Sequence, residues 1–309
     1  MAASRASRRA RAWTVVRWSA VVVVLAGLAV AAAANIDELR DVELDVAPWW
    51  LLAAAPFTAA ASVVLPLAWQ RTVIGLGGRL PALTAVRIWW VSQAARFVVT
   101  MVGTAAGRMT LAAREGVRME VAAGAQVVEL ILLVGWSVGL GSLPGSGAPV
   151  APSVRAVLLV AAVVGLALLP CSAGAGLRLV HRFRPQVDIS SVDRRGLLVA
   201  EATYGLNAVL RSVAFLFVAA GLLPVEADDV PLLLAGWNLA AVAGIIGVTP
   251  AGLGVREGAM VALLAGRFGA GGAAALAALW RAWELGFELV SVATFTLLGR
   301  RRVRQSSTT

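Results

Sequence analysis

Long apolar runs alternate with short polar segments along this chain of 309 residues. A helix of about 20 apolar residues is long enough to cross the hydrocarbon core of a bilayer, which is about 30 Å thick. The pattern therefore predicts an all-α polytopic membrane protein with about six full spans. These spans cover residues 13–34, 47–68, 119–140, 154–177, 196–222 and 270–298.

The first apolar run, residues 13–34, is predicted to be a span and not a cleaved signal peptide. Its apolar part is too long for a signal sequence, and an acidic loop follows it without a clear small-residue cleavage site. We expect a cytoplasmic basic N-terminus over 1–12 and a cytoplasmic tail over 301–309. The segment between them, 13–300, is expected to be one transmembrane domain, with halves of roughly 13–140 and 154–300.

The polar segments differ in charge, and this difference predicts the orientation of the chain. Residues 4–13, 70–79, 178–195 and 300–304 are rich in arginine, whereas 37–45, 141–153 and 224–229 are acidic or uncharged. Arginine-rich loops remain in the cytoplasm. We therefore expect a multi-pass protein of the plasma (inner) membrane with both termini in the cytoplasm.

Two further apolar segments, 81–107 and 231–267, are ambiguous by length alone. With the orientation above, the first must leave from and return to the cytoplasmic side, and the second must do the same from the external side. The sequence thus predicts two re-entrant or broken-helix segments in an inverted-repeat arrangement, which is typical of midplane sites in transporters. A pair of short spans or an interfacial hairpin remains an alternative for each segment.

The stretch GVTPAGLGVREG, residues 247–258, interrupts the second of these segments with helix breakers. We expect a helix over 231–248, a break at Pro250, Gly252 and Gly254, and a half-length helix over 255–266. The N-terminus of that second helix, with Arg256 in its first turn, suits an anion because its N–H groups are free and its dipole end is positive. The alternative is a structural turn in which Arg256 and Glu257 pair with each other.

Composition narrows the functional classes. The chain is 60% hydrophobic and 14% charged, with a net charge of +10, one cysteine and one histidine. The arginines lie at the ends of apolar segments and form no basic domain, so no nucleic acid partner is predicted. A disulfide framework and a conventional zinc site are excluded, and neither a metal nor a cofactor is expected. The arginine-only basic residues and the many alanines are typical of a GC-rich bacterial genome.

Ionisable and polar side chains inside the apolar runs are the candidate substrate-binding residues, because such groups normally face a cavity or a partner. Steps of three and four residues place Tyr204, Asn207 and Arg211 on one helical face together with Glu201, and Arg281, Glu284 and Glu288 on another. Other charged candidates are Arg96, Arg108, Glu129, Arg256 and Glu257. Structural ion pairing between helices is the alternative for some of them. No catalytic residue is predicted, since carboxylates such as Glu284 and Glu288 have no nucleophile or metal beside them.

Three motifs resemble one known family. The segment TPAGLGVREGAMVALL (249–264) is similar to the PGGLGVRE signature of the flippase-like, lysylphosphatidylglycerol synthase transmembrane-domain family. ARFVVTMVGTAAGRMTLAAREG (95–116) and LWRAWELGFELV (279–290) are similar to two other elements of that family, and the resemblance extends over about 13–300. Val99-Thr100 stands where the family often has Pro-Gly, and Ala251 replaces the first of its paired glycines.

The resemblance implies a function as well as site residues. It points to Arg96, Gly107, Arg108, Glu129, Pro250, Gly252, Gly254, Arg256, Glu257, Arg281 and Glu284. It implies movement of a phospholipid or lipid-linked glycan, anionic or glycosylated, between leaflets. Without a Walker loop no intrinsic ATP hydrolysis is expected, and without a soluble domain no lipid aminoacylation. Alternatives are a non-catalytic membrane scaffold for an envelope glycosyltransferase or a similar partner, and a lipid-modifying enzyme.

Overall fold

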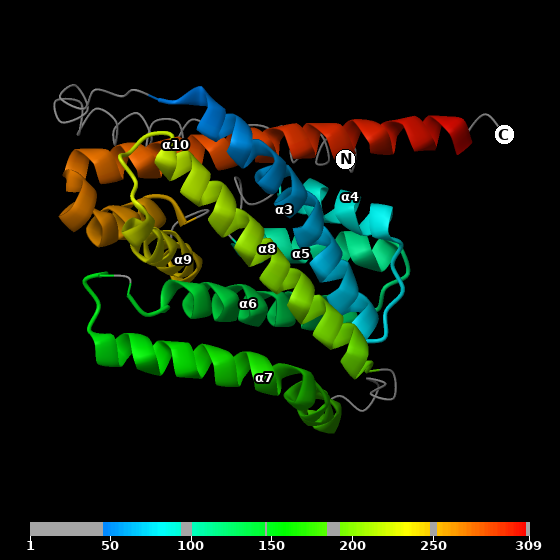
Figure 1. Ribbon diagram of the computed structural model, residues 1–309. Helices are drawn as coiled ribbons and strands as arrows, with labels where there is room; N and C mark the ends of the chain where they lie inside the picture. Colours follow the sequence, from blue (N-terminus) through cyan, green and yellow to red (C-terminus); the bar gives the residue numbers. More distant parts are fainter. Residues whose placement is uncertain (1–45, 94–100, 146, 184–191, 248–251, 307–309) are drawn as a thin grey trace, which may run out of the picture.

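The computed structural model describes residues 46–93, 101–145, 147–183, 192–247 and 252–306, and within these ranges all regular secondary structure is helical (Figure 1). The elements are α3 (Pro48–Gly75), α4 (Ala82–Gln93), α5 (Met101–Arg114), α6 (Met119–Gly141), α7 (Pro152–Phe183), α8 (Arg194–Ala220), the 3-10 helix η2 (Ala227–Asp229), α9 (Val230–Ile246) and α10 (Val255–Ser306).

Six of the described helical segments are long and apolar enough to cross a membrane, so the all-α polytopic fold is confirmed and the chain is an integral membrane protein. Five predicted spans correspond to α3, α6, α7, α8 and the second part of α10. The predicted span 13–34 lies outside the described residues. The remaining membrane-length segment is Ala227–Ile246, which joins η2 to α9.

Helices α3 and α8 run antiparallel, side by side, across the middle of the molecule (Figure 1). The backbone N–H of Ala47, before α3, donates to Gly221 O after α8 at 2.9 Å. At the opposite end Asp193 N donates to Gly75 O at 2.8 Å, and the Asp193 carboxylate caps α8 by accepting from Arg195 N. These contacts define two ends of the bundle, which we name the Gly221 end and the Gly75 end.

The first ambiguous segment forms two short helices, α4 and α5, that enter from the Gly75 end. Trp90, near the end of α4, donates its indole N–H to Ser62 O in the middle of α3 at 3.1 Å. That carbonyl is free because Pro66, four residues later in the helix, has no N–H to donate. The chain then returns, since α6 begins at the same end, where Val121 packs against Gly78.

The second ambiguous segment is also broken, as predicted. Helix α9 ends at Ile246 and α10 begins at Val255. An ion pair joins the two ends of this hairpin. It links Asp229, just before α9, to Arg267 on α10, with Oδ1 and Nε 2.7 Å apart. Both ends of this hairpin therefore lie at the Gly221 end, opposite to the entry of α4 and α5. The inverted arrangement of two re-entrant elements is thus present in the fold.

Two glycines make the second hairpin possible. Gly252 has φ +68°, and a Cβ on it would lie 2.8 Å from Gly244 O, so only glycine allows the break to pack this closely on α9. Gly269 has φ +72° and ψ +161°, which is not helical, and it separates the first part of α10 from the last span. The predicted boundary between 267 and 270 falls at this glycine.

Two buried apolar clusters hold the hairpins in place. One surrounds Trp69 and Trp90 and joins α3, α4 and α6. The other contains Phe215, Trp237 and Trp280, whose rings lie 5.0 to 5.7 Å apart, and joins α8, α9 and α10. Helix α7 differs, because only 11% of the residues in its most apolar stretch are buried inside the protein. The exposed valines of α7 form an apolar surface that is suited to contact with lipid.

Candidate functional site

A cavity of about 490 Å³ lies between the two hairpins, and α3, α4, α5, α6, α8, α9 and α10 all contribute to its wall. Nine of the candidates predicted from sequence line it. They are Arg108, Glu129, Tyr204, Asn207, Arg211, Arg256, Arg281, Glu284 and Glu288. The candidates that share one face of α8 and those that share one face of α10 therefore line the same cavity.

The other candidates have different positions. Gly252 and Gly254 form the break before α10 and have positive φ angles of 68° and 79°. Glu257 lies beside the cavity, within 3.7 Å of two arginines that line it. Arg96 and Pro250 lie outside the described residues.

One charged cluster belongs to the first hairpin and consists of an ion pair between Arg108 on α5 and Glu129 on α6. The two residues are 3% and 7% exposed. The Arg108 guanidinium lies over the rings of Trp69 and Trp89, at 5.5 and 4.9 Å from their centroids. Its Nε donates to Ser92 Oγ at 3.3 Å, and Trp89 donates to Glu129 at 3.4 Å. Because both charges are matched and surrounded, this pair is a complete structural unit.

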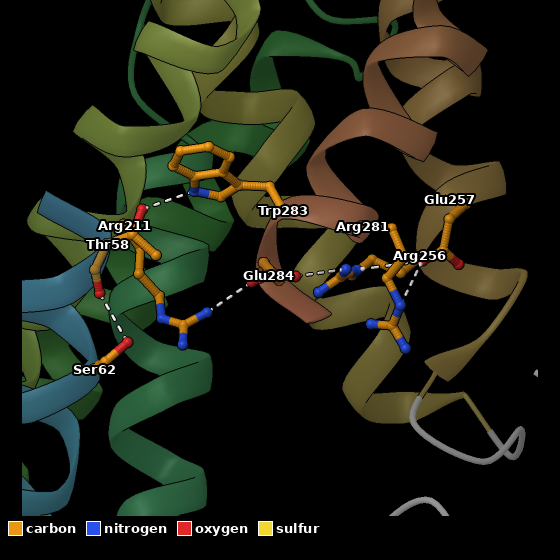
Figure 2. A network of polar contacts seen from close by, with 8 residues as sticks. All are labelled: Thr58, Ser62, Arg211, Arg256, Glu257, Arg281, Trp283 and Glu284. Carbon is orange, nitrogen blue, oxygen red and sulfur yellow. Dashed lines mark hydrogen bonds and ion pairs between the residues drawn. The ribbon is translucent and has the colours of Figure 1, made fainter. Parts of the chain in front are cut away.

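The second cluster contains Arg211, Arg256 and Arg281 with the carboxylates of Glu257 and Glu284 (Figure 2), and Glu288, one turn further along the last span, lines the same cavity. Glu284 accepts from Arg211 Nη1 at 2.6 Å and lies 2.7 Å from Arg256 Nη2. Glu257 Oε1 lies 3.7 Å from the Nε atoms of both Arg256 and Arg281. Arg256 thus contacts its neighbour Glu257, as the structural alternative proposed, but its shorter contact is with Glu284 on the last span.

One backbone N–H group at the start of α10 has a side-chain partner. Gly254 N, just before the first helical residue, donates to Glu257 Oε2 at 2.8 Å. The carboxylate three residues into the turn reaches back to the N-terminus, as the glutamate of a capping box does. Glu257 thus occupies this one donor, and the anion site expected at the helix N-terminus remains a prediction.

A polar seam on α3 fixes the rotation of the last span. Trp283, next to Glu284, donates its indole N–H to Thr58 Oγ1 at 2.9 Å (Figure 2). Thr58 in turn donates to Ala54 O, and Ser62 donates to Thr58 O, so the seam is continuous along α3. With Trp283 held on α3, the neighbouring Glu284 faces the cavity and its arginines.

Sequence reasoning missed several uncharged residues of the wall, because it searched for charges. Thr104, Gln126, Trp136, Trp237 and Asn238 line the cavity. A signal existed for two of them. Thr104 lies four residues before Arg108 and so shares its helical face, and Asn238 is a lone amide within an apolar run, where it donates to Ser212 Oγ at 3.1 Å.

Comparison with known proteins gives no family. No protein-family model matches the chain, and no curated protein matches it. Within the described ranges, no group of three or more His, Cys, Asp or Glu side chains could hold a metal ion. The resemblance to the flippase-like family therefore remains a prediction that rests on the three motifs, and the site has to be interpreted from its own geometry.

Proposed function

We propose that this integral membrane protein binds an anionic or glycosylated lipid by its head group and moves it between leaflets without hydrolysing ATP. One observation carries the proposal. Three arginines from separate parts of the fold, Arg211 on α8, Arg256 on the second hairpin and Arg281 on the last span, line a single cavity inside the bundle. Charges placed within membrane-spanning segments are costly and normally serve a substrate path.

Guanidinium groups suit a phosphate because their planar N–H groups bind two oxygens at once. In the structure Glu284 bridges two guanidinium groups, since each of its two oxygens contacts a different arginine. A lipid phosphate entering the cavity replaces Glu284 as the acceptor for Arg211 and Arg256. The arginines remain compensated during this exchange, and Arg281, three residues before Glu284 on the same face of the last span, stays as a positive neighbour of the displaced carboxylate.

The wall of the cavity also supports access from the lipid phase. Val127 and Leu130 on α6 line the cavity and are 59% and 45% exposed. In a bilayer, exposed apolar side chains in the middle of a spanning helix face hydrocarbon. A lipid can therefore place its head group in the cavity while its acyl chains stay in the bilayer. The hairpins, which enter from opposite ends, provide one movable element for each leaflet.

The distribution of arginines also predicts how the protein is oriented in the membrane. Arg71, Arg79 and Arg194 lie near the Gly75 end, which we assign to the cytoplasm, and Asp228 lies near the Gly221 end. In a Cys171→Ser background, a cysteine introduced at Asp228 is expected to react with an impermeant thiol reagent added outside. A cysteine at Ser190 is expected not to react. The reverse labelling would contradict the assignment.

The function is tested by Arg256→Ala in proteoliposomes that contain a fluorescent anionic phospholipid. We expect transport to fall about a hundredfold, because hydrogen bonds between charged groups contribute about 1.5–3 kcal/mol each. Arg256→Lys keeps the charge but loses the two-pronged geometry, so it should be partly active. The matched control is Arg71→Ala, an exposed arginine on α3, which should transport normally. Normal transport by Arg256→Ala, or its failure to fold, would show that the charge is structural.

A further inference from the structure

We infer that the binding of an anionic head group in this cavity is coupled to the uptake of a proton by the carboxylates of Glu284 and Glu288. This inference rests on the proposed function, because it adds a proton to the ligand that the arginines receive. It is carried by the balance of charges around the second cluster and by the burial of both carboxylates, whose residues are 6% and 7% exposed.

The charges around the second cluster balance within the described residues. They belong to three arginines and three glutamates, namely Arg211, Arg256, Arg281, Glu257, Glu284 and Glu288. Glu284 contacts Arg211 and Arg256. Glu257 lies 3.7 Å from the Nε atoms of Arg256 and Arg281, and Glu288 interacts electrostatically with Arg256. Each carboxylate therefore has an arginine, and the set is neutral before a ligand enters.

The other titratable groups that face the cavity do not alter this balance. Arg108 on α5 and Glu129 on α6 line the same cavity, but they form a neutral pair of their own. Tyr204 on α8 also lines it, and a phenol is uncharged near neutral pH. The described side chains that α3, α4 and α9 contribute to the wall are apolar or neutral, such as Gln93 and Asn238.

An anionic head group disturbs this neutral set. A phosphodiester carries one negative charge, and in the exchange described above it takes the place of Glu284 at Arg211 and Arg256. Arg281 stays near the displaced carboxylate, but Glu257 lies beside it as well. One phosphodiester and three carboxylates then share three arginines. A buried carboxylate without a full countercharge becomes neutral by binding a proton, and this restores the balance.

The positions of Glu284 and Glu288 make them the acceptors of that proton. They lie four residues apart on the last span and share a helical face, and two neighbouring carboxylates hold a proton between them. Glu257 differs, because its Oε2 accepts from Gly254 N at 2.8 Å, and such a bond favours the ionised form. Water supplies the proton, which forms one O–H bond on a carboxylate oxygen. Solvent reaches the cluster, since the side chain of Arg211 is 23% exposed.

The experiment compares two lipids that share a phosphodiester but differ in net charge. Phosphatidylglycerol carries one negative charge, whereas the quaternary ammonium of phosphatidylcholine cancels that charge, and neither head group titrates near neutral pH. Short-chain forms of both are titrated calorimetrically into the protein in an uncharged detergent. Between about pH 5.5 and 8, uptake of about one proton should tighten phosphatidylglycerol binding by up to about tenfold for each unit by which the pH falls.

The uptake itself is measured by repeating the titration in two buffers of different ionisation enthalpy. For phosphatidylglycerol, the difference in heat should correspond to about one proton bound per lipid. Any binding of phosphatidylcholine should take up no proton and should not change with pH, because its head group brings its own positive charge.

Two variants assign the proton to the carboxylate pair. Glu284→Gln and Glu288→Gln each leave three arginines with two carboxylates, so a phosphodiester completes the balance without a proton. Both should bind phosphatidylglycerol independently of pH, and about tenfold more tightly than wild type at the highest pH. Glu288→Gln makes this test without removing the bridge between Arg211 and Arg256, on which folding can depend. The matched control is Glu120→Gln at the exposed start of α6, which should keep the wild-type pH dependence.

The outcomes separate this inference from the function beneath it. If the wild-type protein binds phosphatidylglycerol at no pH, the proposed lipid-binding function fails, and this inference with it. Binding that is equal at every pH, or that follows sodium concentration and not pH, leaves the arginine site intact and shows that proton coupling is wrong. The inference is also overturned if phosphatidylcholine shows the same pH dependence, or if both glutamine variants retain it.

Discussion

The two charged clusters use the same residue types in different ways. In the first hairpin, one arginine meets one carboxylate, and the side chain of Arg108 is 4% exposed between two indole rings. In the second, Arg211 and Arg256 share Glu284, and their side chains are 23% and 13% exposed. The difference shows that an intramembrane ion pair is not by itself a binding site. Under the proposed function, the greater exposure of Arg211 and Arg256 distinguishes the second cluster from the first.

This comparison assigns different tasks to the two hairpins. The Arg108–Glu129 pair joins α5 to α6 and holds the first hairpin against a spanning helix. The second cluster joins three pieces of chain, α8, the start of α10 and the last span. A ligand that replaces Glu284 therefore changes the contacts among three elements at once, whereas the first cluster offers no comparable exchange.

The largest expected effect is on stability at the first cluster. Arg108→Ala leaves the Glu129 carboxylate buried and unpaired, which typically costs about 3–5 kcal/mol. We expect poor accumulation and a much lower melting temperature in detergent. Replacing both residues, as in Arg108→Met with Glu129→Leu, should recover most of the stability, because no charge remains uncompensated. A stable Arg108→Ala protein that has lost only transport would break the comparison, since the first cluster would then be a binding site.

A smaller effect is expected at the break of the second hairpin. Gly252→Ala forces a Cβ to within 2.8 Å of Gly244 O at a positive φ, which should cost about 1–3 kcal/mol. Gly254→Ala is the matched control, because its φ is also positive but nothing lies within 4 Å of the new Cβ. Amide hydrogen exchange in α9 should rise clearly in the first variant and only slightly in the second. Equal exchange in both would show that the close approach to α9 is unimportant.

The smallest effect is expected at the base of the second hairpin. Asp229→Asn weakens the contact with Arg267, whose side chain is 42% exposed and therefore well screened by solvent. The melting temperature should fall slightly, and the difference from wild type should shrink as salt is added. A loss as large as that of Arg108→Ala would show that the two hairpins are anchored with equal strength.

Much of this architecture could be predicted from local chemistry. Pro250, Gly252 and Gly254 predict the break, and the arginine-rich loops predict that each hairpin returns to its own side. Steps of three and four residues predict that Asn207 and Arg211 share a face. The partner of each arginine could not be predicted, because Glu257 is next to Arg256 in sequence whereas Glu284 is closer in space. Gln126 could not be predicted, since a neutral side chain gives by itself no sign that it faces a cavity, and Thr104 could have been found only through its spacing from Arg108.

Pro66 has a consequence for how the protein is assembled during synthesis. A helix as short as α4 cannot be positioned by the bilayer, because it does not reach both interfaces. Its depth has to come from protein, and the carbonyl that Pro66 leaves free on Ser62 provides a fixed point for Trp90. Since the chain emerges from its N-terminus, α3 is available before α4. We therefore expect α3 to insert first as an ordinary span and then to act as the template on which the first hairpin finds its depth.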